Sequence, residues 1–435
     1  MIFKRKLYDK LLVWKQQTAG TKALLIEGAR RIGKSTLVEE FAKNEYRSYL
    51  MIDFNKVSDS VISAFNNYMN DLDTFFLILS SEYGVRLYPK ESIIIFDEIQ
   101  QFPKARQAIK YLVADGRFDY IETGSLISIK ENVNDITIPS EERTLLMYPM
   151  DFEEFAWAMN EEPLMAYIRQ CFDKKVPLEQ GVHAKAMLLF RQYMIVGGMP
   201  KSLSAYLENN RSFEMADMEK RDILTLYRND IKKIKSGYRS SVLSIFDQIP
   251  AFLSRSERRV VMNRIEKGAS FPKYHDTFFW LSDSMIANEC FNCSDPNVGL
   301  SLNEDRTYVK CYMGDTGLLI SHTFDENEIS DGELYREILL GKLSVNEGMF
   351  YENVIAQMLV ATGHKLYFYT RYNQEKHRND MEIDFILSNH SKLRYKIFPI
   401  EVKSNDKYSI RSLTRFNESF RQRIGGSYVI HRKNL

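Results

Sequence analysis

Residues Gly28 to Ser35 have the types and the spacing of a loop that binds phosphate. Gly28, Gly33, Lys34 and Ser35 satisfy the pattern G-x-x-x-x-G-K-[ST]. Glycines let backbone N–H groups approach phosphate oxygens, and the following helix adds the positive end of its dipole, so Lys34 should reach the phosphates and Ser35 should ligate Mg²⁺. Arg30 and Arg31 of the loop are expected to contact the nucleotide or a partner; the equal alternative is that they contact only solvent. The residues expected to line the nucleotide are Gly28, Ala29, Arg30, Arg31, Ile32, Gly33, Lys34, Ser35 and Thr36.

Two acidic residues end another apolar segment and supply chemistry that a phosphate loop lacks. Asp97 and Glu98 follow the run "SIIIF", which is typical of a central parallel strand buried on both faces. Catalytic groups in open parallel sheets gather at the carboxyl ends of the strands. We expect Asp97 to hold Mg²⁺ through water, and Glu98 to orient and polarise the water that attacks the γ-phosphate.

Two hydroxyls and one arginine are candidates for sensing the terminal phosphate. Thr123 and Ser125 end the fourth predicted strand, where a γ-phosphate sensor would stand. Arg143 begins the fifth strand after a polar loop, and an arginine there would stabilise transition-state charge in cis or from a neighbouring subunit. The alternative for Arg143 is a surface ion pair with Glu141 or Glu142.

A second constellation near the C-terminus has the order helix Glu, strand Asp and E-x-K. Glu352 belongs to a predicted helix, Asp384 to a strand, and Glu401 and Lys403 to the strand "FPIEVKSN", in which positions i and i+2 share a face. This is the order of a restriction-endonuclease-like site, whose carboxylates bind Mg²⁺ while the lysine assists water. The alternative is that Glu401 and Lys403 pair on one strand face. We favour a nuclease-like fold over cleavage by the isolated protein.

The elements that position the N-terminal residues alternate in type. Residues 23–42 are predicted to form an apolar strand, a turn bounded by glycines and a helix. Three further strands are predicted at 48–54, 118–125 and 143–149, besides the one that ends at Asp97, and segments of helical period separate them. This alternation predicts an α/β domain with a parallel sheet.

The middle of the chain is predicted to be helical. Gly197, Gly198 and Pro200 interrupt an apolar-periodic helix and indicate a stop and a re-entry. Residues 239–295 suit short helices of a winged-helix-like region. A basic cluster there contacts DNA phosphates or, as the favoured alternative, is a solvated helix face. Its members are Arg255, Arg258, Arg259 and Arg264.

Composition limits the class of protein. A chain of 435 residues with 44% hydrophobic and 27% charged residues predicts two or three packed domains. A formal net charge of +1 gives no global attraction to nucleic acid. We expect a cytoplasmic protein without a membrane segment. Cys290 and Cys293 form a C-x-x-C, but structural thiols are favoured over zinc because no second pair completes a site.

In this order, the motifs resemble those of prokaryotic AAA-type ATPases whose C-terminal half is a domain of unknown function. The N-terminal markers are "GARRIGKST", "IIIFDEIQ", "TGS" and "YPMDFEEF". The C-terminal markers are "YMIVGGMPKSL", "YRNDI", "CYMGDTGLL", "EGMFYENVIAQML", "EIDFIL" and "IEVKS". The resemblance spans nearly the whole chain and implies ATP as the nucleotide. The sequence departs from the family pattern at "SEER", before Arg143, which weakens the assignment of that arginine.

The resemblance and the motifs together predict three domains. Residues 1–158 are expected to form an AAA-like P-loop ATPase domain, 159–330 a helical and winged-helix-like region, and 331–435 a restriction-endonuclease-like α/β domain. The working hypothesis is a Mg²⁺-dependent ATPase whose nucleotide state changes its C-terminal half, for DNA handling or defence. A nucleotide-regulated nuclease and a signalling switch with little turnover and a protein partner remain alternatives, and both a monomer and self-association stay open.

Overall fold

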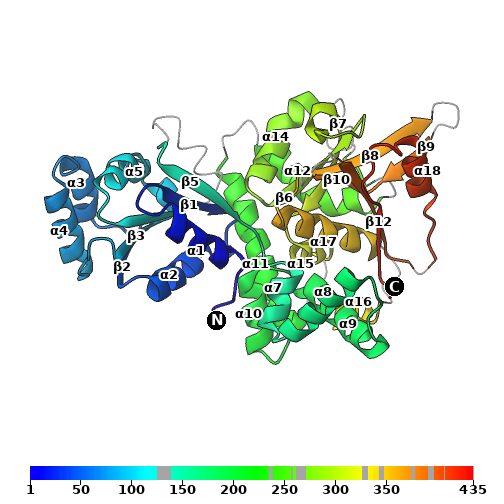
Figure 1. Ribbon diagram of the computed structural model, residues 1–435, viewed down its shortest axis with the longest axis horizontal. Coiled ribbons are helices and arrows are strands. Elements are labelled where there is room, and N and C mark those ends of the chain that lie inside the picture. The colour runs from blue at the N-terminus through cyan, green and yellow to red at the C-terminus, as the bar shows by residue number, and fades with distance from the viewer. Residues whose placement is uncertain are drawn as a thin grey trace. The chain divides into compact units, whose positions relative to one another are not determined.

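The computed structural model forms two compact units, Met1–Tyr148 and Pro149–Leu435 (Figure 1). The first unit ends before the expected boundary at residue 158, and the expected boundary at 330 does not separate compact units. The structure describes residues 1–124, 139–234, 239–255, 258–260, 271–325, 332–341, 347–373, 378–389, 396–405 and 407–434.

The first unit is built on a parallel sheet, as the sequence predicted. Its five strands follow the order β2-β3-β4-β1-β5 and every neighbouring pair is parallel. All residues of β1 and β3 are buried, because these strands are covered on both faces. The strands are β1 (Ala23–Gly28), β2 (Ser48–Asp53), β3 (Ser92–Asp97), β4 (Asp119–Gly124) and β5 (Glu142–Met147).

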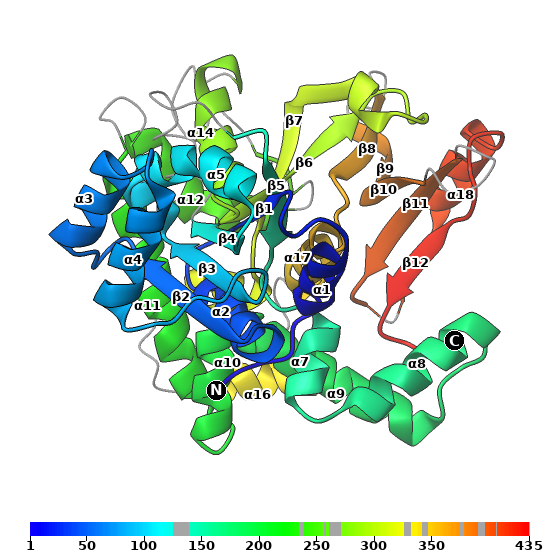
Figure 2. The same cartoon turned by 60° about the vertical axis from the view of Figure 1, so that its left-hand side comes forward.

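Helices cover the two faces of this sheet (Figure 2). α2 contacts β2, β3 and β4 on one face. On the other face, α3, α4 and α5 enclose a hydrophobic core in which the rings of Phe54, Phe65 and Phe96 pack edge to face or tilted. The helices are α1 (Leu7–Gln17), α2 (Lys34–Glu45), α3 (Asp59–Asn67), α4 (Leu72–Tyr83) and α5 (Pro103–Asp115), with the short helix η1 at Ile99–Gln101.

Local sequence signals explain where these helices begin and end. The side chains of Ser58 and Asp71 accept hydrogen bonds from the first turns of α3 and α4. α4 and α5 end at Gly84 and Gly116, both in the left-handed conformation that glycine adopts without strain. Pro103 begins α5, where its missing N–H leaves no bond unmade.

The second unit contains most of the helices. α9 ends at Val196 and α10 begins at Pro200, which confirms the predicted stop and re-entry. The helices are α7 (Phe152–Ala158), α8 (Glu162–Lys174), α9 (Gln180–Val196), α10 (Pro200–Glu208), α11 (Phe213–Lys232), α12 (Arg239–Leu253), α14 (Phe271–Asp283), α15 (Thr316–Thr323), α16 (Glu333–Leu340), α17 (Glu347–Ala361) and α18 (Arg411–Ser419), with η3 at Leu300–Asn303.

Two small sheets complete the second unit. One has the order β7-β6-β8-β9 and the other β10-β11-β12, and α17 contacts strands of both (Figure 2). β6 pairs with β8 across the expected boundary at 330, so the middle and the end of the chain share a sheet. The strands are β6 (Ala287–Cys293), β7 (Glu304–Met313), β8 (Leu366–Asn373), β9 (Arg378–Ile383), β10 (Phe385–Asn389), β11 (Lys396–Lys403) and β12 (Tyr428–His431).

The region predicted to be winged-helix-like contains α12 and α14 followed by the antiparallel pair β6 and β7. Helices followed by a hairpin are compatible with such a region, which stays a prediction. Within the described ranges, no helix has both the length and the apolar character that a bilayer crossing requires.

Candidate nucleotide-binding site

The predicted phosphate loop connects β1 to α2. Arg31 and Gly33 adopt positive φ angles of 68° and 89°, so the backbone of the loop turns through the left-handed region twice. A Cβ atom on Gly28 would lie 2.4 Å from the carbonyl oxygen of Met147, which explains why glycine stands there. The Ile32 side chain is fully buried and anchors the loop, whereas Arg30, Arg31 and Thr36 are exposed.

Lys34 is folded back onto the loop. Its Nζ donates hydrogen bonds to the carbonyl oxygens of Gly28 at 3.0 Å and Ala29 at 2.9 Å. The side chain is buried, and this burial lowers the pKa of Lys34 to about 8, although the Glu98 and Asp97 carboxylates oppose the shift. The structure therefore holds a cationic donor inside the loop, where phosphate oxygens would be bound.

Two of the predicted side chains converge on one carboxylate oxygen of a third. Ser35 Oγ donates to Asp97 Oδ1 at 2.7 Å, and Thr123 Oγ1 donates to the same oxygen. Burial raises the pKa of Asp97, while the hydrogen bonds from Thr123 and Ser35 act in the opposite direction. A hydroxyl and a carboxylate side by side are the oxygen ligands that Mg²⁺ prefers, so Ser35 and Asp97 fit the predicted metal.

Glu98 lies next to this group in a strained backbone conformation. Its φ angle is 54°, which is uncommon for a residue with a side chain. Its backbone N–H donates to Thr123 Oγ1 at 3.4 Å, and Gln100 Nε2 donates to its Oε2. The buried Gln100 lies within the marker "IIIFDEIQ" but was not predicted as a site residue, because no motif assigns a role to a glutamine at that position.

One predicted residue, Arg143, is not placed with the loop. The strand register pairs Arg143 with Leu24, four residues before Gly28, which puts the arginine about 13 Å along the strand from the phosphate-binding end. Arg143 is exposed there, and the predicted role in cis therefore does not fit this position. Ser125 lies outside the described residues.

The ion pair with Glu142 that was the alternative for Arg143 is formed by Arg106 instead. Glu142 accepts two hydrogen bonds from Arg106 of α5, at 2.7 and 2.9 Å, and both side chains are buried. The fully buried Glu122 of β4 lies near this pair, and burial followed by the Glu142 charge raises its pKa well above the ordinary value. A glutamate inside an apolar strand was the available sequence signal for this cluster.

The C-terminal E-x-K residues form the ion pair that was the alternative to a nuclease site. Lys403 Nζ lies 2.9 Å from Glu401 Oε2. Glu401 is 1% exposed, and burial raises its pKa against the opposing effect of Lys403. Asp384 Oδ2 accepts a hydrogen bond from the backbone N–H of Val402 at 2.8 Å and so fastens the start of β10 to β11.

Glu352, the fourth candidate, is enclosed by cationic and hydroxyl donors. Its carboxylate accepts hydrogen bonds from Lys310 Nζ at 3.2 Å and from the Tyr312 hydroxyl, and it also pairs with Arg258. Lys310 is fully buried and pairs in addition with Glu382 at 3.1 Å. Glu352 is thus neutralised by its own unit. Among the residues that the structure describes, no three or more His, Cys, Asp or Glu side chains are arranged to hold a metal ion.

Two arginines of the predicted basic cluster lie over aromatic rings, and the cysteines are buried. Arg255 and Arg259 lie over the rings of Phe252 and Tyr308, and Arg264 lies outside the described residues. All four cysteines are buried free thiols. Cys293 Sγ donates weakly to two backbone carbonyls, and burial raises its pKa to about 11, as expected of a structural thiol.

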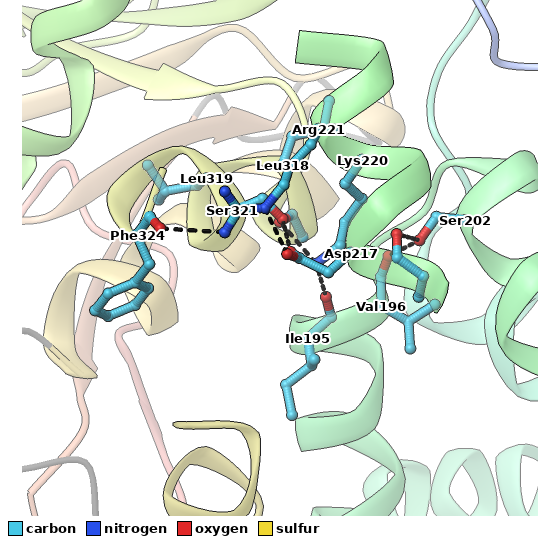
Figure 3. A network of polar contacts seen from close by, with 12 residues as sticks. Ile195, Val196, Ser202, Asp217, Lys220, Arg221, Leu318, Leu319, Ser321 and Phe324 are labelled. Atoms are coloured by element: carbon cyan, nitrogen blue, oxygen red, sulfur yellow. Dashed lines mark hydrogen bonds and ion pairs between the residues drawn. The ribbon is translucent and has the colours of Figure 1, made fainter. Parts of the chain in front are cut away.

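A buried polar network joins α9, α11 and α15 (Figure 3). Lys220 Nζ donates to the carbonyl oxygens of Ile195 at 2.7 Å and Gly317 at 3.3 Å, and it pairs with Asp217 at 3.5 Å. Asp217 also accepts from the Ser321 hydroxyl. Because each charge is paired or hydrogen-bonded, the network fixes how these helices pack.

Several of the C-terminal sequence markers meet beside this network. Asp315 of "GDTGLL" accepts hydrogen bonds from the backbone N–H of Gly198 at 2.6 Å and from Gln357 Nε2 at 3.1 Å. Gln357 Nε2 also donates to the Tyr193 hydroxyl at 3.0 Å. Residues of these markers therefore form buried hydrogen bonds that connect different segments of the second unit.

Three family models match separate parts of the chain. Residues 20–156 match the family model described as "AAA domain". Residues 187–328 and 347–435 match two models described as domains of unknown function (DUF8612 and DUF4143). Together with the parallel sheet of the N-terminal unit, the first match supports an AAA-type ATPase domain over residues 20–156. No curated protein matches the chain at a significant level.

Several solved structures are similar to this chain at low identity. The Thermotoga maritima RuvB Holliday junction branch migration motor is 12% identical, with 66% of this chain and 89% of that chain covered and a TM-score of 0.28. AMPPCP-bound DnaA from Aquifex aeolicus is 10% identical, with 65% and 90% covered and a TM-score of 0.26. The signal transduction ATPase with numerous domains (STAND) PH0952 from Pyrococcus horikoshii is 12% identical, with 82% and 48% covered and a TM-score of 0.29.

Proposed function

We propose that this protein is a Mg²⁺-dependent ATPase whose nucleotide state controls its C-terminal unit. The observation that carries the proposal is the convergence of Ser35 and Thr123 on Asp97, beside a lysine held inside the phosphate loop. These side chains come from α2, β3 and β4, and they meet at the carboxyl edge of the parallel sheet. Ligands of such sheets bind at that edge.

Each residue has a role that follows from its position. Lys34 exchanges its two carbonyl partners for phosphate oxygens, and the loop N–H groups bind further phosphate oxygens. Ser35 and Asp97 hold Mg²⁺, which, when bound, offsets the negative charge of the phosphates. Gln100 fixes one oxygen of Glu98, so the other oxygen is directed to the water that attacks the γ-phosphate.

Equilibrium binding of ATP tests the nucleotide site. Wild-type protein should bind ATP more tightly with Mg²⁺ than with a chelator, because Ser35 and Asp97 provide the metal ligands. Lys34→Ala should weaken binding at least about tenfold, since a charge-assisted contact contributes 1.5–3 kcal/mol. Lys43→Ala is the matched control, because this exposed lysine of α2 pairs with Glu39 and lies over the ring of Tyr49, not in the phosphate loop. Equal affinities for Lys34→Ala and wild type would contradict the proposal.

Contact with nucleic acid is a second candidate function, favoured by the surface around α18. Residues 403–423 contain six lysines and arginines and two acidic residues, although the whole chain is nearly neutral. Lys407, Arg411, Arg415 and Arg421 are exposed. Such a surface suits a phosphate backbone, whose binding weakens steeply with salt.

Binding of a labelled DNA duplex at increasing salt tests this second function. Arg411→Glu with Arg415→Glu should weaken binding and flatten its salt dependence. The matched control is Lys185→Glu with Lys201→Glu, two exposed lysines of α9 and α10 that form ion pairs. Equal loss in both double variants would assign the binding to net charge alone and remove α18 from the proposal.

Each of the two alternative functions makes a different experimental prediction. A nucleotide-regulated nuclease requires strand cleavage with Mg²⁺ that Glu401→Ala or Lys403→Ala abolishes, and the enclosure of Glu352 by Lys310, Tyr312 and Arg258 weighs against it. A signalling switch requires tight ATP binding with negligible phosphate release and a protein partner. A role for Arg143 requires self-association, because its place in the register suits only a neighbouring subunit's nucleotide.

A further inference from the structure

Arg5 connects the phosphate loop to the last residue of the first unit. This arginine lies just before α1 and is 7% exposed. Its Nη1 donates to the carbonyl oxygen of Ile32, inside the loop, at 3.0 Å. Its Nη2 donates to the carbonyl oxygen of Tyr148 at 2.6 Å. One planar guanidinium therefore fixes two backbone segments that are far apart in the sequence.

The end of β5 is packed closely against the start of the loop. The strand register pairs Gly28 with Met147, and a Cβ on Gly28 would come within 2.4 Å of the Met147 carbonyl oxygen. A movement of the loop at Gly28 would therefore displace the backbone of Met147, which precedes Tyr148. Charge-assisted bonds from Arg5 add to this steric coupling.

The chain immediately after Tyr148 has little conformational freedom. Pro149 fixes its own φ and biases Tyr148 toward an extended conformation. Met150 is already anchored in the second unit, because its N–H donates to the Gly198 carbonyl at 2.8 Å and its carbonyl accepts from the Tyr193 hydroxyl at 2.8 Å. Only one residue separates the atom that Arg5 holds from the residue that the second unit holds.

We propose that Arg5 is a positioning residue that passes the nucleotide state of the phosphate loop to the junction at Tyr148–Met150. The inference rests on the proposed nucleotide site. Phosphate binding turns the loop N–H groups toward the ligand and reorients the Ile32 carbonyl on the same backbone. Arg5 follows that carbonyl, and the Tyr148 carbonyl follows Arg5. The effect reaches Met150 and its partners, Gly198 and Tyr193, through the covalent chain.

Hydrogen exchange of the junction amides, with and without Mg-ADP, tests this inference. In wild type, the nucleotide should change exchange at Met150 and the first turn of α7 several-fold. Arg5→Met should keep nucleotide affinity within about fivefold and lose this change at the junction, while the loop itself stays protected by nucleotide. The matched control is Arg117→Met, which removes ion pairs to Asp73 and Asp115 elsewhere in the same unit and should keep the junction response.

The outcomes separate the inference from the proposed function. Absence of ADP binding in wild type would defeat the nucleotide site itself. Binding without any change at the wild-type junction, or a change that persists in nucleotide-bound Arg5→Met, would overturn the role of Arg5. If Arg5→Met does not fold, Arg5→Lys decides: a single ammonium cannot reproduce the two-pronged geometry, so a full junction response in Arg5→Lys would also overturn the inference.

Discussion

Thr123 illustrates how a single hydroxyl is expected to matter at the candidate site. It donates to Asp97 and accepts from the backbone N–H of Glu98, so it links the two acidic residues. Thr123→Val keeps the side-chain volume and removes both bonds. We expect phosphate release to slow about tenfold or more and unfolding free energy to fall by about 1 to 2 kcal/mol. Steady-state phosphate release and urea unfolding measure the two effects.

Thr144→Val is the matched control for this prediction. Thr144 lies on the edge strand β5 and is exposed. It should change neither turnover nor unfolding free energy measurably. Equal turnover in Thr123→Val and Thr144→Val would remove Thr123 from the site.

Glu289 makes the stability of the second unit depend on pH. Burial, followed by the charges of Asp283 and Glu304, raises the pKa of Glu289 to about 7, while Ser282 and Arg306 act in the opposite direction. Because the folded-state pKa lies above the ordinary value of 4.5, the stabilising protonated form is lost as pH rises through about 7. The unfolding free energy should therefore fall by about 2 kcal/mol between pH 5.5 and pH 8 from this group.

Glu289→Gln should remove that share of the pH dependence. The comparison is the difference in unfolding free energy between wild type and variant, measured by urea at both pH values. Relative to wild type, the variant should gain about 2 kcal/mol more stability at pH 8 than at pH 5.5. A pH-independent difference would show that Glu289 does not titrate in this range.

The sequence predicts the phosphate loop and the acidic pair because their chemistry requires particular residue types at fixed spacing. Lys34, Ser35, Asp97 and Thr123 all lie where the loop and the strand ends place them. The sequence does not predict the contacts of Arg5, because its partners are backbone carbonyl oxygens and every residue has one. Its role depends on which backbone segments the fold brings together.

At the scale of elements, Gly198 marks a close approach between two segments. A Cβ there would lie 2.1 Å from the carbonyl oxygen of Met150, which is a backbone atom that cannot rotate away. Gly198→Ala should therefore lower the unfolding free energy of the second unit by about 3 kcal/mol or more. Gly332→Ala is the control, because nothing lies within 4 Å of its Cβ position and its φ is −51°. Fluorescence-detected urea unfolding compares the two variants, and similar losses would contradict the packing argument.

Glu352 shows how a predicted catalytic residue serves as an element's anchor. Glu352→Ala would remove the buried carboxylate that pairs with Lys310 and Arg258. We expect a loss of about 3 kcal/mol of unfolding free energy, measured by urea. Glu347→Ala removes a more peripheral carboxylate of the same helix, 3.7 Å from Arg432, and should cost less than about 1 kcal/mol. A loss no larger for Glu352 than for Glu347 would reopen its assignment to a nuclease site.

Elements were predicted well where local pattern decides them. The buried parallel strands and the break at Gly197 to Pro200 were readable from apolar runs and turn residues. The pairing of β6 with β8 was not, because it joins segments more than seventy residues apart and leaves no periodic signal in either. That pairing is the reason the expected boundary at 330 falls inside one unit.

At the scale of the molecule, the two units divide the roles. The N-terminal unit, Met1–Tyr148, carries the proposed nucleotide site, and its sheet places Asp97 and Thr123 at one edge. The C-terminal unit, Pro149–Leu435, carries buried polar networks at the positions of its sequence markers. We infer that the markers of the second unit preserve its packing.

Phosphate release from Mg-ATP by wild type, Lys34→Ala and Glu98→Gln, each with and without duplex DNA, shows whether the proposed site hydrolyses ATP. We expect turnover by wild type, loss of turnover in both variants, and retained ATP binding in Glu98→Gln alone, because Glu98 acts on water and Lys34 on phosphate. Stimulation by DNA would support nucleic-acid contact by the second unit. Turnover that survives both substitutions, or no turnover by wild type with or without DNA, would contradict the assignment of this site as an ATPase.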